Sequence, residues 1–269
     1  MKYVLFLDIL GFKDRLKALS QDDAISFISG FSSTVYSQWE SNPKCEHSLE
    51  GYIVSDSLII NTRNTSSRSL VDLLDVANSI CKEVFSKNSI LLRGAIAKGE
   101  YDKVEAKELK SLGKGLIVGQ AYVDAYLLEG SVKTLGIVLS KEVYEDVQAL
   151  NRNNQFSISE ETLNKEKNYV FRYLDIDYLL DAQVLTRFVK LASESKWRPH
   201  YYNALYFSMK HESAKKADQV ISNIVTIISN DSPSENWRRL DLFIQNTFAN
   251  GVIPEYQTRF LRFIRNQLQ

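Results

Sequence analysis

Two aspartates stand where the chain could bind a cation. Asp8 interrupts the apolar run YVLFLDILGF (residues 3–12), and Asp56 lies between the two apolar runs of LEGYIVSDSLIIN (49–61). Carboxylate oxygens are hard ligands that suit Mg²⁺ or Mn²⁺, with water and substrate phosphates completing the shell. Two cations held in this way can activate an attacking oxygen and neutralise a reacting phosphate. This chemistry requires the two carboxylates to face each other across a short gap.

The turn after Asp8 contains Gly11, so successive backbone N–H groups there could point at phosphate oxygens. For either aspartate alone, turn formation or helix capping is the more common role. A bound cation in place of solvent would explain why Asp8 lies within an apolar strand.

Hydrophobic periodicity predicts the elements that must position these residues. Strands are predicted at 2–8, 89–100, 115–119, 135–140 and 169–180, with a hairpin over 49–61. Helices are predicted at 24–39, 69–85 and 120–130, and residues 101–114 are predicted to form an exposed loop or a short helix. The order βαββαβ, followed by βαβ, indicates an α+β sandwich with a ferredoxin-like sheet covered by helices.

The composition narrows the class of protein. Lys+Arg and Asp+Glu both total 33 among 269 residues, so no overall charge favours binding to nucleic acid. Cys45 and Cys81 form no CxxC motif, and the three histidines are dispersed, which argues against a disulfide framework or a zinc site. No apolar stretch has the length of a membrane span or a signal sequence, so we expect a cytoplasmic protein.

The pattern changes near residue 181. We expect a catalytic domain over 1–180 and a helical C-terminal extension over 181–269, with amphipathic helices at 218–229 and 237–248. The segment KWRPHYYNALYF (196–207) mixes basic and aromatic residues, but the core of a helical extension explains it better than contact with nucleic acid.

Five segments, taken together, resemble the class III nucleotidyl cyclases over most of residues 1–150. They are FLDILGF, YIVSDSLII, LLRGAIAKGE, GLIVGQAYVDAYLLEG and GIVLSKEVYED, in the family's order and with similar spacing. The resemblance implies that Asp8, Asp56 and the Ile9 carbonyl bind two Mn²⁺ or Mg²⁺ ions per active site. Ser55 stands where the family usually has glycine.

The resemblance also assigns the phosphate contacts. It implies that Leu10, Gly11 and Phe12 form the phosphate-binding turn and that Arg93 neutralises charge on the triphosphate. Active sites of the family lie between two protomers, so the resemblance implies a homodimer with composite sites.

Four positions depart from the purine-specific members of the family. Tyr52 and Leu116 stand where those members carry charged or polar base-reading residues, and an aromatic ring with a hydroxyl could contact a smaller base. Val123 and Leu127 replace the Asn and Arg that stabilise the transition state. The nearby Asp124 and Tyr126 could substitute for that pair, but a solvated helix face is the simpler expectation.

The form of these segments is similar to one branch of the family, the pyrimidine nucleotide cyclases of bacterial anti-phage (Pycsar) signalling. This implies a UTP or CTP cyclase, with UTP favoured, whose cyclic product acts on a separate effector protein. Two alternatives remain open. One is a catalytically silent homologue that binds nucleotide or dimerises as a sensor; the other is a palm-type polymerase or diguanylate cyclase, which the turn Val54–Ser57 argues against because it lacks a GGDEF-like motif.

Overall fold

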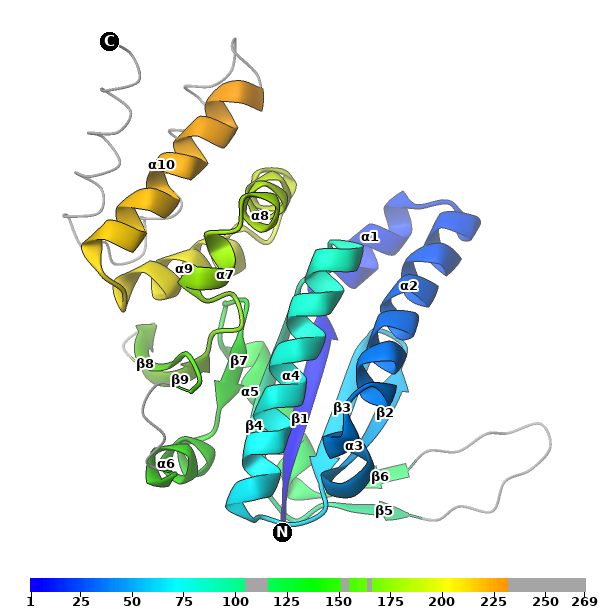
Figure 1. The fold of residues 1–269 in the computed structure, drawn as a ribbon. Coiled ribbons are helices and arrows are strands. Elements are labelled where there is room, and N and C mark those ends of the chain that lie inside the picture. The colour runs from blue at the N-terminus through cyan, green and yellow to red at the C-terminus, as the bar shows by residue number, and fades with distance from the viewer. Residues whose placement is uncertain (105–115, 151–154, 164–165, 232–269) are drawn as a thin grey trace. The chain divides into compact units, whose positions relative to one another are not determined.

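The computed structural model of the chain describes residues 1–104, 116–150, 155–163 and 166–231 (Figure 1). Its contacts divide the chain into two compact units. The first comprises Met1–Val132 and Gly136–Tyr173, and the second comprises Lys133–Leu135 and the chain from Leu174 onward. The domain limits expected from the sequence, with a boundary at residue 180, stay a prediction.

A mixed seven-stranded sheet forms the first unit, in the order β2-β3-β1-β4-β7-β9-β8. Its neighbours pair antiparallel except β4 and β7, which are parallel. The strands are β1 (Lys2–Ile9), β2 (Leu49–Val54), β3 (Ser57–Thr62), β4 (Leu92–Gly99), β7 (Ile137–Leu139), β8 (Ile158–Leu163) and β9 (Glu166–Phe171). The sheet and its helices confirm the α+β class.

Six helices belong to the described part of this unit. They are α1 (Phe12–Ala18), α2 (Gln21–Glu40), α3 (Pro43–Ser48), α4 (Ser67–Asn88), α5 (Gln120–Ser131) and α6 (Lys141–Ala149). Helix α4 follows the predicted apolar stripe, because Leu70, Leu73 and Ile80 are fully buried. The helix begins at an N-cap in which the Ser66 side chain accepts a hydrogen bond from the Ser69 amide.

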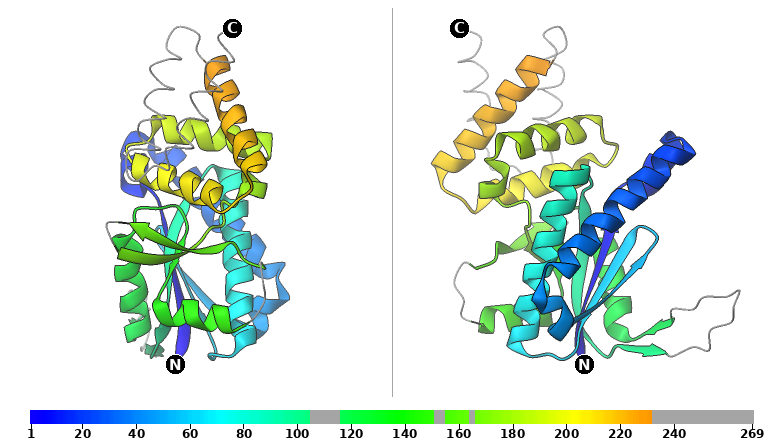
Figure 2. Two further views of the ribbon diagram at one scale, coloured as in Figure 1. Left: turned by 90° about the vertical axis from the view of Figure 1, so that its left-hand side faces the viewer. Right: turned by 45° about the vertical axis from the view of Figure 1, so that its right-hand side comes forward.

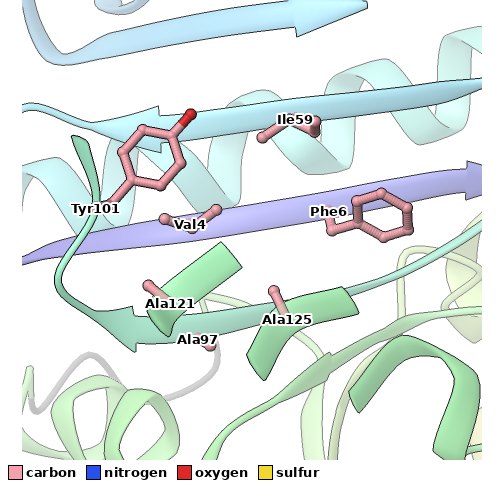
Figure 3. Close-up of a cluster of buried hydrophobic side chains, with 7 residues drawn as sticks. All are labelled: Val4, Phe6, Ile59, Ala97, Tyr101, Ala121 and Ala125. Carbon is pink, nitrogen blue, oxygen red and sulfur yellow. The ribbon is translucent and has the colours of Figure 1, made fainter. Parts of the chain in front are cut away.

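Helix α5 lies on the face of the sheet opposite α4, against β1 and β4 (Figures 2 and 3). Alternation along β1 turns Val4 and Phe6 toward α5, where they pack with Ile59 and with the small residues Ala121 and Ala125 (Figure 3). Asp8 continues the same alternation, so it belongs to the α5 face. The small residues let α5 approach the sheet closely.

Several sequence expectations need correction. Residues 102–104 form β5 (Asp102–Val104), which pairs with β6 (Leu116–Val118) in a separate two-stranded sheet, where a loop or short helix was expected; residues 105–115 lie outside the described part. The last predicted strand is too long, because β9 ends at Phe171 and Asp175 caps the next helix. Strand β8 and helix α6 were not predicted.

Helices make up most of the described part of the second unit from Leu174 onward. Its helices are α7 (Ile176–Leu179), α8 (Ala182–Glu194), α9 (Arg198–Lys210) and α10 (Ala214–Asp231). The rings of Tyr201 in α9 and Phe188 in α8 are buried and in contact, in agreement with a core role for the aromatic segment 196–207. The helix expected at 237–248 lies outside the described residues.

None of the helices described is both long and apolar enough to cross a membrane.

Candidate functional site

Strand pairing brings two of the predicted residues, Asp8 and Arg93, to one edge of the sheet. In the β1–β4 register Asp8 is opposite Arg93, and in the β1–β3 register it is opposite Ser57. The Ser57 hydroxyl donates a hydrogen bond of 3.3 Å to Asp8 Oδ1, and Arg93 Nη2 lies 3.6 Å from Asp8 Oδ2. Asp8 and Arg93 therefore share a row on the α5 face.

The β2–β3 hairpin adds Asp56 to this edge. Its turn is formed by Ser55 and Asp56, and Ser55 has a φ of 58°, in the left-handed region that favours glycine. The Ile9 amide donates a hydrogen bond of 3.2 Å to the Asp56 carbonyl, which ties the turn to the end of β1. Sequence reasoning placed Asp8 and Asp56 side by side, and the backbone contacts bring their chain segments together.

The charge around Asp8 is unfavourable in the absence of a cation. Burial raises the pKa of Asp8 from 3.8 to about 6, and the Asp56 carboxylate adds to the increase, whereas Arg93 and Ser57 oppose it. A divalent cation would relieve this repulsion, and the carboxylate oxygens are the ligands that Mg²⁺ and Mn²⁺ prefer. Asp8 and Asp56, with the Ile9 carbonyl, thus fit the metal that the sequence implied.

The described residues contain no cluster of three or more His, Cys, Asp or Glu side chains suited to a metal. Two carboxylates would therefore carry the site, and neutral oxygens would complete the shell. This composition is common where a substrate's phosphates supply further ligands.

Glu129 is the residue that sequence reasoning missed. It lies in α5, is 6% exposed, and forms an ion pair with Nε of Arg93. Burial raises the pKa of Glu129 to about 7, while Arg93 lowers it and Asp8 raises it. The signal was present in the sequence: Ala121, Ala125 and Glu129 are spaced by four, so a helix that buries the two alanines also turns Glu129 inward.

In the predicted phosphate-binding turn, at least one backbone amide already has a partner within the protein. Gly11 has a φ of 73° and precedes α1, which agrees with the need for glycine at this position. The Leu10 amide, however, donates a hydrogen bond of 3.0 Å to the Leu91 carbonyl. The expectation that this amide holds a phosphate needs correction, because the sheet already uses it. The Phe12 ring packs on Phe27.

The two base-reading candidates lie on different sheets. Tyr52 is opposite Ile59 in the β2–β3 register, so it shares the α5 face with Asp8. Lys103 Nζ lies 4.9 Å from the centroid of the Tyr52 ring, so the two side chains form a cation–π contact. Leu116 begins β6 and pairs with Val104 of β5.

Helix α5 presents an apolar outer face where the family has its transition-state pair. Val123, Tyr126 and Leu127 are 45%, 54% and 63% exposed. Asp124 accepts a hydrogen bond of 2.7 Å from the Gln120 side chain, and the Tyr126 ring meets the edge of Phe6. The structure gives neither Asp124 nor Tyr126 a contact with Asp8 or Arg93.

Comparisons with known proteins bear on the fold. No family model matches the sequence, and no curated protein matches it. Among solved structures, the chain is similar to the adenylyl cyclase CyaB from P. aeruginosa, with 13% identity over 63% of this chain and 92% of that one, at a TM-score of 0.50. It is also similar to the guanylate cyclase domain of RhGC from Catenaria anguillulae, solved in complex with GTP, with 15% identity over 63% and 93% of the chains, at a TM-score of 0.46.

The likeness to CyaB concerns the fold. At this identity the shared features are a mixed sheet and the helices on it. The chain thus shares the α+β fold of the adenylyl cyclase CyaB, with Asp8, Asp56 and Arg93 gathered at one edge of its sheet.

Proposed function

We propose that the chain is a pyrimidine nucleotide cyclase, which converts UTP or CTP to the 3′,5′-cyclic nucleotide and pyrophosphate. The observation that carries the proposal is the meeting of Asp8, Asp56 and Arg93 on a cyclase fold. Two carboxylates and a guanidinium at one sheet edge suit a nucleoside triphosphate and its divalent cations.

In the proposed reaction, the ribose 3′-hydroxyl attacks the α-phosphorus and an oxygen–phosphorus bond forms. The bond from the α-phosphorus to the bridging oxygen breaks, pyrophosphate leaves, and the hydroxyl proton passes to solvent. Asp8, Asp56 and the Ile9 carbonyl would hold Mn²⁺ or Mg²⁺, which supplies Lewis acidity for the hydroxyl and the phosphates when bound. Arg93 neutralises charge on the triphosphate. The amides of Gly11 and Phe12 remain for the phosphates, while Leu10 contributes its place in the turn.

We attribute the proposed preference for a pyrimidine base to Tyr52 and Leu116. Tyr52 lies on the same sheet face as Asp8, and its hydroxyl can donate to or accept from a base edge. An aromatic residue and an aliphatic one offer no charged contact for a purine. UTP is favoured over CTP by the resemblance alone.

A homodimer is part of the proposal. The outer face of α5 exposes Val123, Tyr126 and Leu127 three and four residues apart, so the three side chains gather on one side of the helix. A second copy of the chain that covers this face would bury apolar surface and would complete composite sites. The cyclic product would act on a separate effector during phage infection, and the protein would work in the cytoplasm.

A second candidate function is a silent cyclase homologue that binds nucleotide or dimerises. The exposed apolar Val123 and Leu127 favour it, because they leave the transition state without a polar partner on α5. It predicts nucleotide binding without release of pyrophosphate.

The test is product analysis of the purified chain and of Asp8→Ala and Asp56→Ala, each incubated with Mn²⁺ and each of the four ribonucleoside triphosphates. We expect cyclic UMP or cyclic CMP from the parent and none from the variants. Absence of any cyclic product from the parent, or retention of it by the variants, would exclude the mechanism. Nucleotide binding without product would support the silent homologue.

A further inference from the structure

We propose that Glu129 is a positioning residue, whose buried carboxylate holds the Arg93 guanidinium away from Asp8 and so keeps Asp8 available to a divalent cation. The inference rests on the proposed cation site at Asp8 and Asp56. It adds a residue that lies on a different element and contacts neither the proposed cation nor the nucleotide.

Helix α5 is built to aim Glu129 at the strand. Ala121 and Ala125 are fully buried against the sheet, and Glu129 continues their stripe one turn further. On β4 the matching row begins at Arg93 and continues through Ala95 and Ala97, which pack under the helix. The two charged side chains therefore meet under α5, with little exposure to water.

Arg93 is shared unequally between two carboxylates. Its Nε pairs closely with Glu129 Oε1, whereas its Nη2 lies 3.6 Å from Asp8 Oδ2. The side chains of Arg93 and Asp8 are 21% and 20% exposed, and that of Glu129 is 6% exposed, so solvent screens these contacts only weakly. With its Nε on Glu129, the guanidinium reaches Asp8 only at 3.6 Å, which is beyond the distance of an ordinary hydrogen bond.

The role of Glu129 becomes visible when a neutral side chain replaces it, as in Glu129→Gln. Arg93 would then have Asp8 as its remaining close carboxylate, and a full ion pair there would occupy the oxygens that a cation needs. Glu129 thereby acts on the cation only through Arg93. A purely structural Glu129 would affect the stability of the fold, and its effect on cation binding would not depend on Arg93.

The experiment measures Mn²⁺ binding to the full chain at pH 8 by electron paramagnetic resonance, without nucleotide. Four proteins form a double-mutant cycle: the parent, Glu129→Gln, Arg93→Gln and the double variant. The matched control is Asp146→Asn, because Asp146 also pairs with a basic residue of β4, Lys98, away from Asp8. Circular dichroism checks the fold of each protein, and Glu129→Asp replaces Glu129→Gln if the latter does not fold.

We expect Glu129→Gln to weaken Mn²⁺ binding by about five- to tenfold, and Glu129→Asp by about two- to threefold. Arg93→Gln should abolish the effect, so that the double variant binds Mn²⁺ as tightly as Arg93→Gln alone. Asp146→Asn should bind as the parent does.

Unchanged Mn²⁺ affinity in Glu129→Gln would overturn the proposal, and so would an equal loss in the Arg93→Gln background. No Mn²⁺ binding by the parent would overturn both this proposal and the proposed function. Intact binding together with an absence of cyclic product would defeat the proposed function alone, because the assay needs neither nucleotide nor turnover.

Discussion

Strand β4 carries a charged side chain near each end, and the two regions differ in how charge is balanced. Near Gly99, Lys98 Nζ donates a hydrogen bond of 2.6 Å to Asp146 Oδ2 of α6, and the buried Tyr3 hydroxyl donates one of 2.8 Å to the same oxygen. Near Leu92, the Asp8 cluster (Asp8, Asp56, Arg93 and Glu129) sets three carboxylates against one guanidinium.

The contrast separates a structural network from the proposed cation site. At the Lys98 end, one cation meets one anion. Burial raises the pKa of the Tyr3 hydroxyl, and the hydrogen bond to Asp146 and its negative charge add to the increase. At the Asp8 end, the excess of negative charge leaves room for an external cation. Proteins commonly accept such local instability at functional sites.

The largest expected difference between the two ends is in activity. Asp56→Asn should lower kcat/KM for the proposed cyclic nucleotide formation by about a thousandfold or more, because it removes one of the two carboxylates proposed to hold the metal. Asp146→Asn should change it less than about threefold. Steady-state kinetics with Mn²⁺ measures both, and similar losses in the two variants would remove the distinction between the ends.

The second difference is a loss of stability at the Lys98 end. Asp146→Asn leaves the ammonium of Lys98 and the hydroxyl of Tyr3 without their anionic acceptor, so the free energy of unfolding should fall by about 1–3 kcal/mol. Urea unfolding at pH 8 measures this change. A neutral outcome would mean that solvent replaces the acceptor.

The Asp8 end should respond with the opposite sign. Without metal at pH 8, Asp8→Asn should raise the free energy of unfolding by about 1–2 kcal/mol, because it removes a carboxylate that burial and Asp56 disfavour. The parent, but not the variant, should gain stability on addition of Mn²⁺. Thermal melts with and without Mn²⁺ provide the measurement.

The stability advantage of Asp8→Asn without metal should depend on pH, because the pKa of Asp8 is raised from 3.8 to about 6. The folded parent holds the proton more tightly than the unfolded chain, so this group stabilises the parent most at pH below about 4 and loses that contribution as the pH rises to about 6. The advantage of Asp8→Asn should therefore be absent near pH 4 and complete above about pH 6. An advantage that is largest at low pH would contradict the assigned cause.

The smallest effect is expected in the hairpin turn of the Asp8 end. Ser55 has a φ of 58°, so Ser55→Gly should relieve strain and stabilise the fold by about 0.5 kcal/mol. Ser89, with a φ of 55° at the end of α4, gives a matched variant, Ser89→Gly. Chemical denaturation of both variants shows whether the turn differs from an ordinary helix end.

Much of the fold followed from periodicity, and the failures have physical causes. The α4 stripe was readable because one face of the helix is buried, and the 49–61 hairpin because two apolar runs flank the turn at Ser55 and Asp56. Strand β8, the outermost strand on one side of the sheet, was missed because its sequence ISEETL alternates poorly between apolar and polar residues. The long strand predicted at 169–180 failed because the capping role of Asp175 outweighed the apolar run around it.

The site was predictable as a pair of acids and less so as a cluster. Asp8 stands out because it interrupts an apolar strand and Asp56 because it lies between two apolar runs, and their neighbourhood followed once the strands were paired. Glu129 did not stand out, because a glutamate in a helix is ordinarily solvated; its spacing of four from Ala125 points inward only once that alanine is known to be buried. The occupied Leu10 amide likewise depends on Leu91, which lies far away in the sequence.

The hydrogen bond between the Ile9 amide and the Asp56 carbonyl has a consequence for ligand recognition. It fastens the hairpin tip to the neighbouring strand end, so the backbone under both acids is already ordered before any ligand arrives. Capture of a ligand then costs little conformational entropy at this edge, and selectivity among ions and nucleotides would depend on charge and fit more than on loop closure.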